Sequence, residues 1–223
     1  MKKFIFTILA LVGTMSLNAQ VVKLMKNGEI VAKYKASQVD EVLFEEEPTF
    51  PFGQGEAEAT IDGKTVYVKW VQLWENGPRF AEYNVGAANN KAEDYGEYFS
   101  WAANIAETQW GPAWRMPTKE ELTALIANCT CTYTTQNEVS GILIKGKDGY
   151  TKNSIFLPCA GYYENGNLIP YAFSYIYWSS DKGGIDNLAI GLHDFNGNHG
   201  VKVNETIHTN VCSGSVRAVL VEE

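Results

Sequence analysis

The sequence predicts an α+β domain of short antiparallel strands with one or two helices, preceded by a short strand-rich N-terminal segment. Turn dipeptides recur roughly every ten residues through the second half of the chain, as in antiparallel domains. Apolar and polar residues alternate on both sides of Asp62-Gly63, and one strong helix start stands at Thr118. The 223 residues are 45% hydrophobic, which is enough to bury a core.

The charge balance excludes two classes of partner. The chain carries 18 Lys and Arg against 26 Asp and Glu, a net charge of −8. A nucleic-acid-binding protein that neutralises phosphates needs a basic face, and so does a protein that adheres to anionic lipid. We therefore expect no nucleic acid among the partners and no adhesion to anionic membranes.

The first nineteen residues predict a signal peptide. Lys2 and Lys3 precede an apolar run from Phe4 to Val12, and small or polar residues lead to Ala19. The alternative is a retained anchor helix, although the run is shorter than a membrane span. No Cys follows the run, so we do not expect a lipoprotein. The sequence thus predicts export to the periplasm or the cell surface, with no membrane insertion after cleavage.

Two further N-terminal segments are expected before the main domain. Residues 20–47 contain apolar runs around Asn27-Gly28, a hairpin signal, and end in Glu45, Glu46 and Glu47. Residues 48–55 carry two Pro and two Gly, which is typical of a linker. The main domain is then expected to cover residues 56–223.

The main domain opens with a hairpin and contains one well-marked helix. Alternation around Asp62-Gly63 predicts two paired strands. Residues 89–106 repeat apolar positions at helical spacing at Tyr98, Trp101, Ala102 and Ile105, which predicts a short helix there. Pro117, Thr118 and Glu121 form a helix start in which the Thr hydroxyl and the Glu carboxylate cap each other's backbone N–H groups. This helix is expected to end near Asn128.

Beyond Asn128 the chain predicts short strands. The turn signals are Asp148-Gly149, Asn165-Gly166, Gly183-Gly184, Asn196-Gly197 and Gly214. They separate apolar runs at residues 142–144, 155–157, 189–190 and 216–221. This pattern is typical of antiparallel sheets with many loops.

The four cysteines leave two interpretations open. Cys129, Cys131, Cys159 and Cys212 are an even number in an exported chain, so a long-range disulfide to Cys212 is one alternative. Cys129 and Cys131 are too close in sequence to pair well with each other. Free buried thiols are the other alternative, and the spacing to His193, His199 and His208 does not fit a zinc site.

Three clusters of residues occur in one order along the main domain. They are residues 83–87 with 93–101; residues 110–118 with 120–122; and, more dispersed, Gly141, residues 156–158, 160–162, 177–180 and 215–219. In this order they resemble the Fibrobacter succinogenes major paralogous domain family, which is widespread in Bacteroidota. The resemblance covers roughly Glu56 to Val221 and implies a C-type lectin-like fold. Residues 21–47 also resemble segments that often precede this domain.

The chain departs from the sugar-binding C-type lectins. Their calcium-binding triplets Glu-Pro-Asn and Gln-Pro-Asp are absent, as is Trp-Asn-Asp, so calcium-dependent sugar binding is not expected. An oxygen-rich run at Asp194, Asn196 and Asn198, with Glu205 in the twelfth position, is the remaining argument for calcium. His199 stands where an EF-hand needs Gly, and we expect no cofactor and no metal.

Several large or charged residues are expected to organise the fold. Trp114 alternates with Met116 into a core, Arg115 pairs with a carboxylate, and buried aromatic residues act as anchors. A site that binds an anion at Arg115 is the weaker alternative. The residues assigned a structural role are Trp101, Trp114, Arg115, Pro117, Thr118, Glu121, Trp178 and Arg217.

The loops between Asn165 and Asn210 are the predicted binding region. Tyr, Asn and His supply aromatic area and hydrogen bonds in both directions, and loops on a rigid scaffold often carry binding. The alternative is that the tyrosines form one face of a strand and close the core. The candidate ligand-binding residues are Tyr171, Tyr175, Tyr177, His193, Asp194, Asn196, Asn198 and His199.

The sequence predicts a non-enzymatic recognition module that binds protein or glycan at the cell envelope. No Gly-x-Ser-x-Gly, His-Glu-x-x-His or phosphate loop occurs. A structural subunit of a surface complex is the first alternative. The second is an enzyme of the formylglycine-generating type, with Cys129 and Cys131 as its reactive thiols.

Overall fold

The computed structural model describes residues 21–26, 29–35, 50–169, 174–184, 188–194 and 201–221. The chain divides into two units, residues 1–48 and 49–223. In the first unit, β1 (Val21–Lys26) pairs antiparallel with β2 (Glu29–Lys35). The side chains of Val21, Ile30 and Tyr34 are exposed on this hairpin. The turn expected at Asn27-Gly28 lies outside the described residues.

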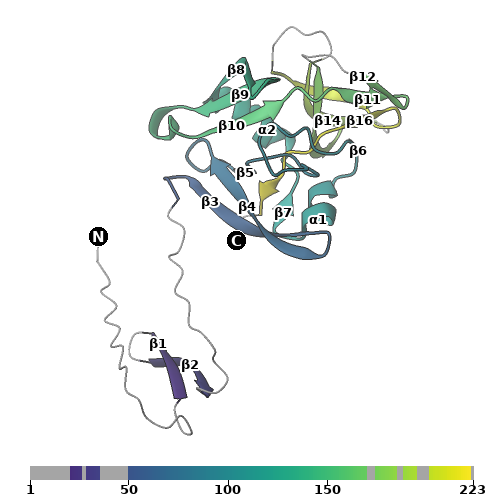
Figure 1. Ribbon diagram of the computed structural model, residues 1–223. Helices are drawn as coiled ribbons and strands as arrows, with labels where there is room; N and C mark the ends of the chain where they lie inside the picture. The colour runs from purple at the N-terminus through teal and green to yellow at the C-terminus, as the bar shows by residue number, and fades with distance from the viewer. Residues whose placement is uncertain are drawn as a thin grey trace. The chain divides into compact units, whose positions relative to one another are not determined.

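The second unit is built mostly from antiparallel sheets, with two α-helices in its described part (Figure 1). Its largest sheet has the order β3-β4-β5-β17-β7. The bounds are β3 (Gln54–Ile61), β4 (Lys64–Gln72), β5 (Arg79–Ala81), β17 (Val219–Leu220) and β7 (Trp114–Arg115). This composition of sheets and helices agrees with the α+β class that the sequence predicts.

Three smaller sheets make up the rest of the sheet structure in the described part of this unit. A four-stranded sheet has the order β12-β11-β16-β6, and two three-stranded sheets have the orders β10-β9-β8 and β13-β14-β15. The bounds are β6 (Phe99–Ser100), β8 (Cys129–Gln136), β9 (Val139–Gly146), β10 (Ser154–Pro158), β11 (Tyr162–Glu164), β12 (Asn167–Ile169), β13 (Tyr175–Lys182), β14 (Leu188–Asp194), β15 (Val203–His208) and β16 (Cys212–Gly214).

The hairpin expected at Asp62-Gly63 is confirmed. Every residue of β3 pairs with one of β4, from Gln54 with Val71 to Ile61 with Lys64. Asp62 and Gly63 both have positive φ angles of 51° and 72°. A two-residue turn needs this left-handed conformation at both positions to match the twist of the strands.

The prediction of a linker at residues 48–55 is wrong for the C-terminal part of this segment. Residues 50–55 belong to the main domain, and β3 already begins at Gln54. The buried amide of Asn153 donates to the carbonyl oxygens of Phe52 (2.9 Å) and Gln72 (2.8 Å). Pro and Gly here form a turn against the domain, with Gly53 at φ +71°.

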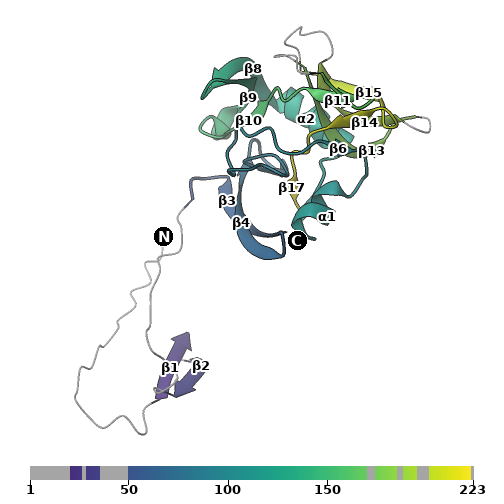
Figure 2. The ribbon, with the colours of Figure 1, turned by 45° about the vertical axis from the view of Figure 1, so that its right-hand side comes forward.

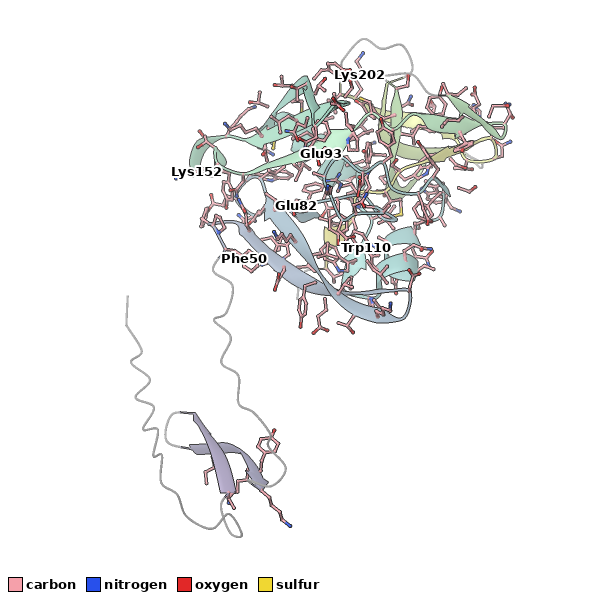
Figure 3. All side chains as sticks on the ribbon, in the orientation of Figure 1. Phe50, Glu82, Glu93, Trp110, Lys152 and Lys202 are labelled. Carbon is pink, nitrogen blue, oxygen red and sulfur yellow. The ribbon has the colours of Figure 1, made fainter. Side chains whose placement is uncertain are left out.

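The helix expected within residues 89–106 begins later than predicted. Helix α1 covers Ile105–Trp110, whereas Phe99 and Ser100 form strand β6. Trp110 at the end of α1 (Figure 3) packs edge-on against Trp114, with ring centroids 5.4 Å apart. The apolar positions therefore do not share one helix face: Ile105 is buried in α1, Tyr98 and Trp101 are partly buried before it, and Ala102 is exposed.

Helix α2 (Lys119–Asn128) begins and ends where the sequence predicts. The Thr118 hydroxyl accepts from the Glu121 N–H at 3.2 Å, and the Glu121 carboxylate accepts from the Thr118 N–H at 2.8 Å. In both views α2 lies between the β8–β10 sheet and the sheet that contains β14 (Figure 2). Its buried Leu122 and Leu125 close one of two apolar clusters.

Replacing Glu121 by Gln is expected to lower the free energy of unfolding by about 1 kcal/mol at pH 7. The Arg115 guanidinium binds both carboxylate oxygens, at 2.7 and 2.6 Å. Burial raises the pKa of Glu121, but the hydrogen bonds from Arg115 and from the Thr118 N–H outweigh burial and hold the pKa below its ordinary 4.5. A carboxyl group whose pKa is lower in the folded than in the unfolded state stabilises the fold at pH values above the unfolded pKa. The difference in the free energy of unfolding between wild type and variant should therefore vanish as the pH falls through the folded pKa.

Chemical denaturation at pH 7 and pH 3 measures this difference. Glu120→Gln is the matched control, because Glu120 is exposed one residue away and should change stability by only a few tenths of a kcal/mol. A difference between wild type and Glu121→Gln that persists unchanged at pH 3 would contradict the assignment.

Candidate functional site

The five-stranded sheet curls so that its two edge strands approach each other. The indole N–H of Trp114, in β7, donates to the carbonyl of Glu58, in β3, at 2.9 Å. The N–H of Val221, directly after β17, donates to the carbonyl of Ala113 at 2.8 Å. Figure 2 shows the β3–β4 hairpin bending round towards β17 and α1. Trp114, Val68 and Ala59 fill the inside of this curl with apolar contacts.

An open cleft of about 890 Å³ remains at one end of the curl. This volume lies in the range of ligand pockets in proteins. Small and apolar residues form part of it, and amide and charged residues form the rest. The lining residues are Glu56, Ala57, Trp70, Gln72, Asn76, Arg79, Pro112, Ala113, Leu220 and Val221.

Trp70 lies flat on the sheet because the residue opposite it is Gly55. The two residues are cross-strand partners, and a Cβ on Gly55 would lie 2.5 Å from the Trp70 ring. On the indole, the guanidinium carbon of Arg79 lies 4.9 Å from the ring centroid. Stacking of this kind attracts the cation to the ring while leaving the N–H groups at the guanidinium edge available.

Within the described ranges, the charged residues that line the cleft are Arg79 and Glu56, and they project to different faces of the sheet. Side chains alternate along a strand, and Glu56 is the cross-strand partner of Lys69. Arg79 is the partner of Gln72, on the same face as Trp70. Within the described part of the chain, the Arg79 guanidinium forms neither an ion pair nor a hydrogen bond.

A second, shallower hollow of about 510 Å³ lies on the four-stranded sheet. Its main features are Tyr98 and Tyr163, whose rings meet edge to face at 5.1 Å. The Tyr98 hydroxyl donates to the carbonyl of Ala160. Burial raises the pKa of Tyr98, and so does the neighbouring Tyr163, so the phenol stays a neutral donor. With that donor occupied, the hollow offers mainly aromatic surface.

Two of the loop candidates are corrected, because Tyr175 and Tyr177 are each only 2% exposed. They lie in β13, in the apolar cluster beneath α2. The Tyr177 hydroxyl donates to the carbonyl of Pro158 at 2.9 Å and accepts from the amide of Asn84 at 3.1 Å. These tyrosines form the strand face that the sequence offered as the alternative, and neither is available to a ligand at the surface.

The other loop candidates lie at the limits of the described residues. Tyr171, Asn196, Asn198 and His199 fall outside them. His193 and Asp194 are the last two residues of β14, and the structure describes their backbone. The predicted calcium ligands therefore receive no structural account. No group of three or more His, Cys, Asp or Glu in the described part of the chain is arranged to hold a metal ion.

The residues assigned a structural role lie at junctions of the fold. Trp114 and Trp178 are fully buried, and the Trp178 indole N–H donates to the Phe99 carbonyl at 2.8 Å. Trp101 is only partly buried, and its indole N–H donates to the Ser179 carbonyl at 2.8 Å. Pro117 is buried immediately before α2.

Arg217 is buried at the centre of a polar network. Its guanidinium donates to the carbonyl oxygens of Glu82 and Phe156, at 2.8 Å each, and to the amide oxygen of Asn84 at 2.9 Å. A longer bond of 3.2 Å goes to the Ala81 carbonyl. Burial lowers the pKa of Arg217 to about 10. The network ties β10 to the segments next to β5 and β17.

The cysteines are four free thiols. Burial raises the pKa of Cys129 to about 12, with Cys131 adding to the effect, and burial also raises the pKa of Cys131. A reactive thiol needs a lowered pKa and solvent access. This environment therefore gives no support to the alternative of a thiol enzyme.

The chain was compared with known proteins at the level of family models, curated proteins and solved structures, and none of the three comparisons finds a match. None of the helices in the described ranges is long and apolar enough to cross a membrane.

Sequence reasoning missed the Trp70–Arg79 pair. Trp70 stood out only as one member of an alternating strand, and Arg79 was not singled out. The available signal was Gly55, because a glycine opposite an aromatic residue across a predicted hairpin allows the ring to lie flat. Pairing of Arg79 with Gln72 depends on β5, a three-residue strand that has no periodicity of its own.

Proposed function

We propose that this chain is an exported, non-enzymatic recognition module with a C-type lectin-like fold, which binds its partner in the cleft at the open end of the curled sheet. The observation that carries the proposal is the stack of Arg79 on Trp70 inside that cleft. An aromatic ring, a cation whose donors have no described partner and two amide side chains form a polar recognition surface on a rigid sheet. Such a surface recognises a ligand without needing a nucleophile or a metal.

The contacts among the family-like clusters support the lectin-like part of the proposal. Asn84, in the first cluster, accepts from Arg217, in the last. Trp178 donates to Phe99, and Trp101 donates to Ser179, so that these two bonds also join the first cluster to the third. Residues that carry the resemblance thus hold the domain together, as expected for motifs that define a fold.

A glycan array probed with the exported chain, with and without calcium, tests the proposed function. Binding is expected without calcium and is expected to fall at least tenfold in Trp70→Ala, because the substitution removes both the aromatic ring and the support of Arg79. Tyr67→Ala is the matched control, since Tyr67 is exposed on the opposite face of the same strand. Binding that is unchanged in Trp70→Ala would move the site away from the cleft.

A role as an assembly subunit is the second candidate function, and the first unit favours it. The β1–β2 sheet has two strands in the described residues, so each strand has an unpaired edge. Val21, Ile30 and Tyr34 are also exposed. Strand edges of this kind pair readily with another chain. Co-sedimentation with the cell-surface fraction, compared between the full exported chain and a chain that lacks residues 21–35, distinguishes this role from ligand binding.

A further inference from the structure

We infer that the ligand of the cleft is an acidic saccharide, a sugar bound through its carboxylate by Arg79. The inference rests on the proposed function, since it names the ligand class of the same site. The first supporting observation is the charge of the cleft. Among the described residues that line the cleft, Arg79 alone has a charged side chain on the Trp70 face, because Glu56 projects from the opposite face beside Lys69.

The guanidinium is held in place for a planar anion. The guanidinium carbon lies over the indole of Trp70, 4.9 Å from the ring centroid, and the indole in turn lies against Gly55. This stacking restricts the side chain before any ligand binds, so less entropy is lost on binding. The N–H groups at the guanidinium edge match the two oxygens of a carboxylate in a bidentate arrangement.

The neighbouring polar groups suit hydroxyl groups. The amide nitrogen of Gln72 donates to the Gly77 carbonyl at 3.0 Å, which fixes the side chain next to Arg79. The Gln72 amide oxygen and the Asn76 side chain form no hydrogen bond within the described ranges. A sugar ring carries several hydroxyl groups that both donate and accept, and these two amides offer both kinds of partner.

The geometry is less suited to a peptide. An extended peptide binds a sheet by pairing with the backbone of a free edge strand. At β3 one position of the outer edge is already engaged, because the Glu58 carbonyl accepts from the Trp114 indole.

Isothermal titration of the exported chain with trigalacturonate and with its methyl ester tests the inference. The two probes differ only in whether the carboxylates are free. We expect the free acid to bind about tenfold or more tightly than the ester, which is the contribution of one charge-assisted bidentate hydrogen bond. Arg79→Gln should remove this preference, and Arg79→Lys should restore only part of it. Lys69→Gln, on the opposite face, is the control and should keep the preference.

The outcomes separate the inference from the proposed function. Equal binding of acid and ester, both lost in Trp70→Ala, overturns the acidic ligand and leaves the cleft as the binding site. Binding of neutral glycans alone likewise overturns the acidic ligand and leaves the cleft as the binding site. A preference for the acid that survives Arg79→Gln places the carboxylate elsewhere and also overturns the inference. No binding by any saccharide overturns the inference and the glycan form of the proposed function together.

Discussion

Replacing Arg217 by Met is expected to lower the free energy of unfolding by about 3–5 kcal/mol. Methionine fills a similar volume but donates no hydrogen bonds. The carbonyl oxygens of Glu82 and Phe156 and the amide oxygen of Asn84 would each lose a donor at 2.8–2.9 Å. Unsatisfied polar groups in a buried position are costly, and three separate segments meet at this one side chain.

Urea denaturation of wild type and variant at pH 7 measures the effect. Arg79→Met makes the same chemical change at the half-exposed cleft and is expected to alter stability by no more than about 1 kcal/mol. If Arg217→Met and Arg79→Met are equally stable, the buried network does not hold the domain together in the way described.

Replacing Trp114 by Ala is expected to lower the free energy of unfolding by about 3–5 kcal/mol. Trp114 is fully buried and packs against Trp110, and its indole N–H closes the curl of the sheet on the Glu58 carbonyl. The substitution leaves a large cavity, and it also leaves the carbonyl without its donor.

Trp114→Phe separates the two contributions. Phenylalanine keeps most of the apolar contact but loses the indole N–H, so a smaller loss of roughly 1–2 kcal/mol is expected. Thermal and chemical unfolding of both variants check the order. If the Phe variant is as unstable as the Ala variant, the hydrogen bond accounts for the whole loss of stability. If the Phe variant is as stable as wild type, the hydrogen bond does not contribute to stability.

The sequence predicted elements whose signals are local. Asp62-Gly63 specifies a turn by its φ angles, and Thr118 with Glu121 specifies a helix start by three-residue spacing, so both appear where expected. Strands β5, β6 and β7 have two or three residues each. Their pairing is decided by segments that lie far away in the chain, and no periodicity in such short runs reveals it.

The candidate site was harder to predict than the fold. Tyr175 and Tyr177 alternate as contact residues on a loop would, but that alternation is equally typical of a buried strand, and burial decided the outcome. Trp70 and Arg79 belong to different strands, and their stacking depends on the register of β4 with β5. The cleft itself exists only because the sheet curls, which is a property of packing and not of any one segment.

The most direct test of the cleft as the binding site follows the indole N–H resonances of the chain by NMR during titration with trigalacturonate. The chain has six tryptophans, and Trp70→Phe identifies the resonance of Trp70. We expect the Trp70 signal to shift with ligand concentration. The signals of Trp114 and Trp178 should stay in place, because their N–H groups are hydrogen-bonded within the core. A Trp70 signal that stays in place at ligand concentrations where calorimetry detects binding would contradict the cleft as the binding site.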